Sequence, residues 1–138
     1  MALSNDPVFP QTPKTAGIAF GAASQSTQLD PATVAPATLV TAGSDGAIVT
    51  SVVVTAEVTV TAEKFVLWIQ LAGAGNWYIL LTGALAAYTQ AATDKQGNVV
   101  LVNKTSPDEA VRLAATDKLG VTHHVDQQSI VFAEYTDF

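Results

Sequence analysis

Residues 48–63 alternate between apolar and polar side chains, and this period of two constrains the fold more than any other feature of the chain. The apolar phase is Ile48, Val52, Val54, Ala56, Val58, Val60 and Ala62, and the polar phase is Ser51, Thr55, Glu57, Thr59, Thr61 and Glu63. Such alternation is typical of β-structure that buries one face. A single strand over this range would reach about 50 Å at ~3.3 Å per residue, which is too long for one small domain. Because the apolar phase moves to odd positions from Phe65 onward, we expect a turn or bulge between Glu57 and Lys64.

Turn signals divide the rest of the chain into further short segments. Gly43 and Gly46 bracket a predicted turn, and residues 72–76 are predicted to be a hairpin loop. Residues 15–38 predict one weak strand followed by a loop. The strands we expect cover residues 17–21, 64–71, 77–82, 99–102 and 129–135.

Two stretches leave the secondary structure open. Ser106, Pro107 and Glu109 form a typical helix start, and Gly120 could end that helix. The alternative is two strands, at 110–113 and 118–125, joined by a tight connection. The strands on either side favour the second reading. The Ala-rich residues 83–92 fit either a helical turn or a loop.

Short strands and recurrent turns predict an all-β fold, an antiparallel β-sandwich of jelly-roll type. In the segment that precedes the sandwich, three prolines within residues 7–13 disfavour a helix and favour an extended backbone. We therefore expect an extended N-terminal arm over residues 1–16 and a single sandwich domain over residues 17–138. Apolar anchors among the prolines suggest that the arm contacts another protein subunit, with Pro7, Val8, Phe9, Pro10 and Pro13 as its site residues.

Charge and composition exclude several classes of partner. The formal net charge is −6 and the six basic residues are scattered, so we expect no nucleic-acid binding. Only 13% of the residues are charged, against about a quarter in an average domain. A surface so poor in charge suits a chain covered by copies of itself or by a partner. No apolar stretch is long enough to cross a bilayer and the first residues lack the pattern of a signal peptide, so we expect no membrane partner.

The sequence carries no recognisable catalytic motif. It has no glycine-rich phosphate loop, no nucleophile elbow and no cysteine. His123 and His124 are neighbours, and neighbours on a strand point to opposite faces, so we expect one in the core and one at the surface. The spacing of Asp117, His124 and Ser129 does not support a catalytic triad. We therefore predict a protein that is not an enzyme, with no cofactor and no metal site.

Several short motifs, taken in order, resemble one family. They are Ala2-Leu3-Ser4-Asn5, residues 10–14, residues 41–48, Val66-Leu67-Trp68-Ile69, residues 112–119 and the terminal residues 131–138. In this order they look like the jelly-roll cement or decoration proteins of tailed-bacteriophage capsids. The resemblance implies a virion protein, made in the host cytoplasm, that binds the outside of the capsid. It also implies a homo-dimer or homo-trimer that clamps neighbouring major capsid proteins.

Two other functions remain open at this point. The chain could be another virion part, such as a tail, collar or fibre component. It could also be a carbohydrate-binding β-sandwich, with Trp68, Trp77, Tyr78 and Tyr88 stacking on sugars. An aromatic cluster more often fills a core or a cross-strand pair than a ligand site. The exposure of these rings in the folded protein separates the two readings.

Overall fold

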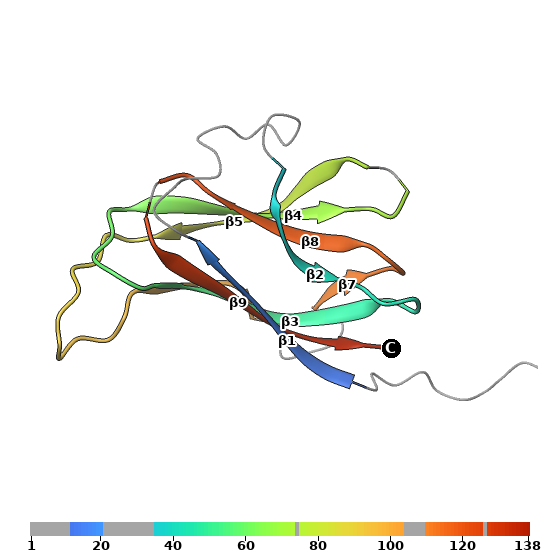
Figure 1. Ribbon diagram of the computed structural model, residues 1–138, viewed down its shortest axis with the longest axis horizontal. Coiled ribbons are helices and arrows are strands. Elements are labelled where there is room, and N and C mark those ends of the chain that lie inside the picture. The colour runs from blue at the N-terminus through green and yellow to red at the C-terminus, as the bar shows by residue number, and fades with distance from the viewer. Residues whose placement is uncertain (1–11, 21–34, 74, 104–109, 126) are drawn as a thin grey trace, which may run out of the picture.

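The computed structural model describes residues 12–20, 35–73, 75–103, 110–125 and 127–138, which form two antiparallel β-sheets packed face to face (Figure 1). The strands are β1 (Thr12–Phe20), β2 (Ala37–Thr41), β3 (Ala47–Ala56), β4 (Glu63–Gln70), β5 (Trp77–Leu85), β6 (Asn98–Asn103), β7 (Val111–Leu113), β8 (Lys118–His123) and β9 (Ser129–Asp137). The first sheet has the order β1-β9-β3-β6, with β7 also paired to β3. The second sheet has the order β2-β8-β4-β5. The all-β sandwich predicted by the sequence is therefore confirmed.

The strands pair as nested couples. β1 pairs with β9, β2 with β8, β3 with both β6 and β7, and the central β4 with β5. β6 and β7 lie along the two halves of β3, so together they occupy the place of one interrupted strand. A chain that folds as one long hairpin and is then rolled over two sheets is a jelly roll. The topology itself thus gives the jelly-roll fold.

The alternating segment divides where the sequence predicts. β3 ends at Ala56 and β4 begins at Glu63, and the residues between them cross from the first sheet to the second. The turn at residues 43–46 and the hairpin around residues 72–76 are also found. Residues 83–85, left open by the sequence, belong to β5, which extends the hairpin beyond its predicted end.

Two strands differ from the prediction. β1 begins at Thr12 and ends at Phe20, so it starts five residues earlier than the weak strand expected at 17–21. Its nine-residue register with β9 holds together a segment whose own sequence shows little alternation. β2 lies at residues 37–41, at the end of a stretch we expected to be loop. β2 is short and lies at the margin of its sheet, and a strand of this length carries little periodicity of its own.

The described part of the disputed segment is strand rather than helix. β7 and β8 are the two strands of the alternative reading, and residues 104–109, which include the predicted helix start, lie outside the described residues. The two strands do not form a hairpin with each other, because β7 pairs with β3 in the first sheet and β8 pairs with β2 and β4 in the second. The connection at residues 114–117 therefore crosses from one sheet to the other.

The core lies between the sheets and consists mainly of valine, leucine, alanine and phenylalanine. Phe65, Leu67, Leu119 and Val121 project from the second sheet. They meet small side chains of β3 and β9 in the first sheet, namely Val49, Val52, Val54, Val131 and Ala133. Small β-branched side chains allow the sheets to interdigitate closely. No helix of a length and apolarity that would cross a bilayer occurs in the part of the chain that the structure describes.

Candidate interaction surfaces

The predicted arm is only partly described. Pro7, Val8, Phe9 and Pro10 lie outside the described residues, so their role stays a prediction. Pro13 is exposed near the start of β1. The predicted arm boundary at residue 16 falls inside this strand. Proline is compatible with β-structure here because β1 lies at the edge of its sheet. The division between arm and sandwich stays a prediction.

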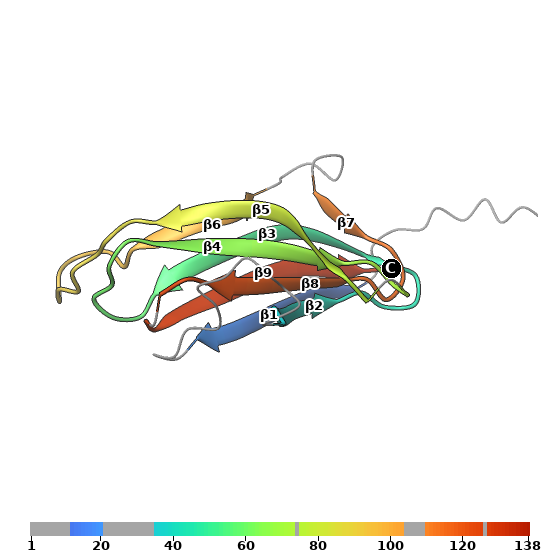
Figure 2. The same ribbon diagram turned by 90° about the horizontal axis from the view of Figure 1, so that it is seen from above.

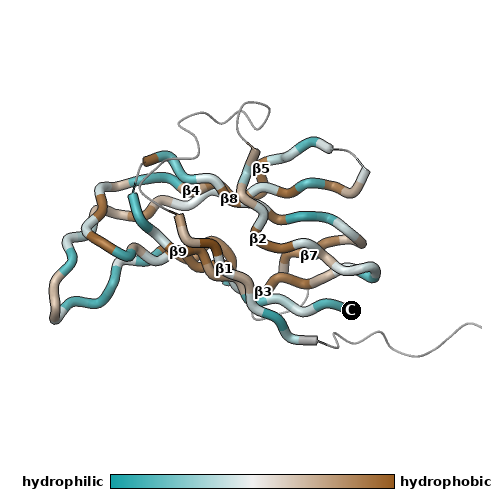
Figure 3. The backbone as a smooth tube through the Cα atoms, viewed as in Figure 1, coloured by the Kyte–Doolittle hydropathy of each residue, from teal (hydrophilic) through white to brown (hydrophobic). Residues whose placement is uncertain are grey.

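A band of apolar side chains crosses the outer face of the first sheet. In register, Gly17 lies beside Phe132, Phe132 beside Val53, and Val53 beside Val100. Two residues further along each strand, and on the same face, Ala19 lies beside Ile130. Phe132 is 45% exposed and Val100 is 49% exposed. We call these six residues the β9 face, and Figure 3 shows the apolar character of β1 and β9 at its centre. Its members are Gly17, Ala19, Val53, Val100, Ile130 and Phe132.

A second group of exposed apolar side chains lies along β5, the marginal strand of the second sheet (Figure 2). Tyr78 and Ile79 are neighbours on this strand, so their side chains leave it on opposite faces. Leu71, Tyr78, Ile79 and Leu81 are all exposed there. We call these four residues the β5 margin. Scattered exposed apolar residues are normal on proteins, but two gathered groups are typical of surfaces that contact other macromolecules.

Trp68 points to the outer face of the second sheet and is nevertheless only 2% exposed. Its indole Nε1–H donates a hydrogen bond to Thr122 Oγ1 at 2.8 Å, and both groups are buried. Nearby, a Cβ on Gly120 would lie 2.8 Å from the Trp77 ring, so this ring packs directly over the β8 backbone. Tyr88 is partly buried, and its hydroxyl donates a hydrogen bond to Gln96 Oε1. These three rings serve packing, which disfavours the carbohydrate-stacking hypothesis; only Tyr78 is exposed.

His123 is in the core and His124 is half-buried at the surface, as the sequence predicts. The His123 ring lies 4.4 Å from the ring of Phe20, and its Nδ1 lies 3.7 Å from Glu63 Oε2. Burial lowers the pKa of His124, and the positive charge of Lys64 lowers this pKa further. Lys14 Nζ donates a hydrogen bond to the Asp137 carboxylate, and this bond and the negative charge of Asp137 raise the pKa of Lys14 in a surface ion pair.

Asp117 has a structural role. Its carboxylate accepts hydrogen bonds from the backbone N–H groups of Ala72 and Ala114, at 2.8 and 2.9 Å. Asp117 precedes β8 and His124 follows it, so a six-residue strand of about 20 Å at ~3.3 Å per residue separates them. They can share neither a metal ion nor a proton relay. Among the described residues, no group of three histidine, aspartate or glutamate side chains could hold a metal ion.

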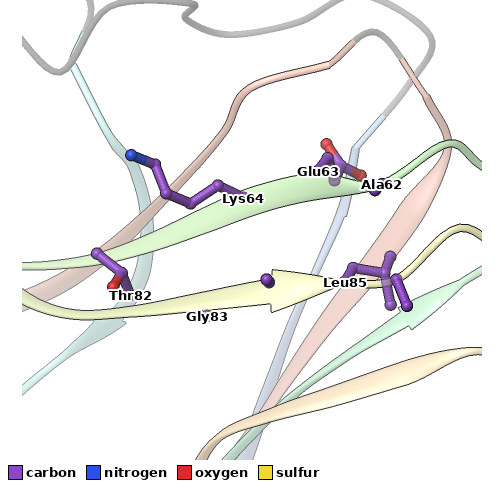
Figure 4. Close-up of a pocket in the computed structure, with 8 residues that line it drawn as sticks. Ala62, Glu63, Lys64, Thr82, Gly83 and Leu85 are labelled. Carbon is purple, nitrogen blue, oxygen red and sulfur yellow. The ribbon is translucent and has the colours of Figure 1, made fainter.

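Two shallow hollows mark the surface of the described residues. The first, of about 500 Å³, lies along β4 and β5, between Lys64 and Thr82 in Figure 4. Most of its lining is alanine, glycine and aliphatic carbon, and the Glu63 side chain beside it is buried. The second, of about 340 Å³, lies beside Thr50, where β3 bulges against β9. The lining of this second hollow is more polar and includes Lys14 and Glu134.

The sequence reasoning missed both apolar surfaces. In β9, Ile130 and Phe132 alternate with the core residues Val131 and Ala133, so the segment is apolar on both faces. A strand at the surface of a sandwich normally alternates apolar with polar residues. The continuous apolar run was therefore a signal of a covered or contacted face. The buried Glu63 carried no such signal, because it fell in the polar phase of the alternating segment.

No protein-family model and no curated protein matches the chain. Among solved structures, the chain is similar to the structure of Eiger TNF from S. frugiperda, with 15% sequence identity and a TM-score of 0.47. The similarity covers 89% of this chain and 85% of that chain. Likeness at this level assigns no function, since unrelated functions recur on one fold.

Proposed function

We propose that this protein is a non-enzymatic structural protein of a tailed-phage virion, a cement protein that binds the outside of the head. In this role it clamps neighbouring major capsid proteins and stabilises the shell. The observation that carries the proposal is the gathering of exposed apolar side chains into two surfaces, the β9 face and the β5 margin. The order of short motifs that resembles capsid cement proteins supplies the identity of the partner.

A clamp needs more than one contact, and the two surfaces meet this need. The β9 face lies on the outer side of the first sheet, and the β5 margin lies on the side edge of the second sheet. One small rigid domain can therefore touch two neighbours at once. Many copies on one shell add their contacts, so each contact can be modest while the whole coat binds firmly.

We assign the shell contact to the β5 margin. Tyr78 and Ile79 are among the most exposed of its side chains, at 48% and 51%. An aromatic ring with a polar tip is a frequent anchor of protein interfaces. The strand that presents these side chains pairs only with β4 among the described strands, and β6 packs against it near Gly83, so unpaired backbone remains toward its Tyr78 end.

Binding to purified heads tests the proposal. Heads that lack the protein are mixed with the full chain and sedimented, and the bound chain is measured together with the temperature at which the heads release DNA. We expect bound protein and a higher release temperature. Tyr78→Ser with Ile79→Ser should abolish both, whereas Thr82→Ser, on the same strand, should not. Heads that bind no protein, or that are equally stable without it, would show that the cement role is wrong.

Labelling of intact virions separates the cement role from the other virion parts. Antibody against the full chain should decorate the head surface. Label confined to the tail, collar or fibres would replace the cement role with one of those roles.

A further inference from the structure

β1 forms an open edge of the first sheet. Among the described strands, β1 pairs only with β9; β2, the marginal strand of the facing sheet, lies close to β1 but does not pair with it. Figure 2 shows β1 at one margin of the sandwich, with β5 and β6 at the other. The backbone N–H and C=O groups that point away from β9 are therefore available to a further strand.

β1 lacks most of the devices that block an edge strand. Proteins protect edges with bulges, short strands, proline or charge. β1 has nine residues in unbroken register with β9, whereas the pairings of β2, β5 and β6 each contain a register shift. Pro13 and Lys14 lie at one end only, and the stretch from Thr15 to Phe20 has neither proline nor charge.

Pro13 indicates which residues face the open edge. A proline is accommodated in an edge strand where the N–H that it lacks would point away from the sheet. Residues of an antiparallel strand alternate in the side to which they present their backbone groups. The open edge is therefore formed by the N–H and C=O groups of Thr15, Gly17 and Ala19, which share the phase of Pro13.

The side chains next to this edge are apolar and nearly uncharged. The Phe132 ring lies beside Gly17, 3.6 Å from the position that a Cβ on Gly17 would occupy. Exposed Ile130 lies beside Ala19. Glu134, which pairs with Thr15, is the one charged residue of the outward-facing stretch from Ile130 to Glu134. A strand that binds this edge must therefore place apolar side chains next to Phe132 and Ile130. Electrostatic attraction cannot contribute most of the binding free energy.

We propose that a second copy of this chain docks on β1, with the two β1 strands antiparallel about a two-fold axis at Gly17. Gly17 then lies opposite Gly17, and Thr15 of each copy lies opposite Ala19 of the other. This register uses the three residues that face the edge and leaves Pro13 outside. The two glycines leave the surface clear between the Phe132 rings of the two copies. A lone peptide strand would supply the hydrogen bonds only, whereas a second copy also brings its own β9 face.

The interface is isologous, as in most symmetric dimers, and it joins the two first sheets into one continuous sheet. It goes beyond the cement role and does not depend on shell binding. A dimer that fails to bind heads would overturn only the cement role. A stable monomer that still binds heads would overturn only the dimer.

Single cysteines test the register, because the chain has none of its own. Cross-linking needs Cα atoms within about 7 Å, a distance met by residues directly opposite each other. Under mild oxidation, Gly17→Cys should cross-link to itself. Thr15→Cys alone should not, but a mixture of Thr15→Cys and Ala19→Cys should. Thr82→Cys, exposed on β5, is the control for random collision. Equal cross-linking at all positions, or none at Gly17, would overturn the proposal.

Sedimentation of the unmodified full chain tests the dimer itself. We expect a dimer whose dissociation constant rises at least tenfold in Phe132→Thr. Tyr78→Thr, at a side chain of similar exposure on the β5 margin, should leave it unchanged. A monomer at all concentrations up to about 100 μM, a range that would populate a dimer held by more than ~5.5 kcal/mol, would overturn the proposal. So would equal effects of the two variants, once far-UV circular dichroism has shown both to be folded.

Discussion

His123 Nδ1 lies 3.7 Å from Glu63 Oε2, and both side chains are completely buried. The imidazole also stacks near Phe65, at 6.2 Å between ring centroids, so aromatic rings surround a polar pair. The same carboxylate oxygen accepts a hydrogen bond from the backbone N–H of Val125 at 3.3 Å. The pair thus joins the start of β4 to the end of β8, at the end of the sandwich where the chain leaves both strands.

Glu63→Ala should lower the free energy of unfolding by about 3 kcal/mol, because it removes one partner of a buried polar pair. Glu63→Leu with His123→Phe should cost less than the sum of the two single changes, since the double variant replaces the pair by apolar side chains. Urea denaturation of the unmodified chain, Glu63→Ala, Glu63→Leu, His123→Phe and the double variant measures this. Strictly additive losses would show that the two side chains are not coupled.

Protonation of His124 should weaken the fold. Its folded-state pKa is lowered below the ordinary value of 6.5, mainly by burial and then by Lys64. The unfolded chain therefore binds more protons than the folded chain between the lowered pKa and 6.5, and the free energy of unfolding must rise with pH across that window. We expect stability to fall as the pH drops below about 6.5.

Urea midpoints at a series of pH values from 7.5 to 5 measure this dependence. His124→Gln should flatten it, and Lys64→Met should reduce it by allowing the pKa of His124 to rise. The charges of Glu63 and His123 also act on His124, so Glu63→Gln is included as a separate series. An unchanged slope in His124→Gln would contradict the assignment to this residue.

The sequence specifies the sandwich well because most of the strands carry strong local signals. The alternation of apolar and polar residues in the segment 48–63 predicts β3, and Gly43 and Gly46 mark the turn before it. β1 and β2 show little alternation of apolar and polar residues. Their extended conformation depends on pairing with β9 and β8, which are distant in the sequence, so local patterns predict these two strands poorly. The connection at residues 114–117 reads as a tight turn, but no local signal shows that it crosses between sheets.

The candidate surfaces were less accessible to sequence reasoning. Whether Phe132 or Val131 faces the core depends on the register of β9 against β3, and both are apolar. The burial of Trp68 on the outer face of its sheet is likewise a tertiary effect, since β4 is apolar on both faces. Three of the four aromatic residues considered for a sugar site, Trp68, Trp77 and Tyr88, thus turned out to be packing residues, while the exposed apolar surfaces were overlooked.

Two glycines in one turn should respond to alanine by very different amounts. Gly46 has φ of +97°, and a Cβ there would lie 2.6 Å from the Leu113 backbone oxygen. Gly46→Ala should therefore lower the free energy of unfolding by about 2–3 kcal/mol, from backbone strain and overpacking. At Gly43 the nearest atom is Asp137 Cγ at 3.6 Å, an ordinary contact, so Gly43→Ala should change stability by less than about 1 kcal/mol. Thermal unfolding compares them, and equal losses would contradict the clash.

Thr122 and Thr82 flank Val66 on the same row of the second sheet, one on β8 and one on β5. Thr122→Val removes the acceptor of the Trp68 indole N–H in a buried site, so it should cost about 1–3 kcal/mol and shift the tryptophan emission. Thr82→Val changes the same atoms at an exposed position and should cost less than about 0.5 kcal/mol. Urea denaturation followed by fluorescence measures both. If the two variants lose equal stability, the Trp68–Thr122 bond does not stabilise the sheet, and the buried outer face is held by apolar packing alone.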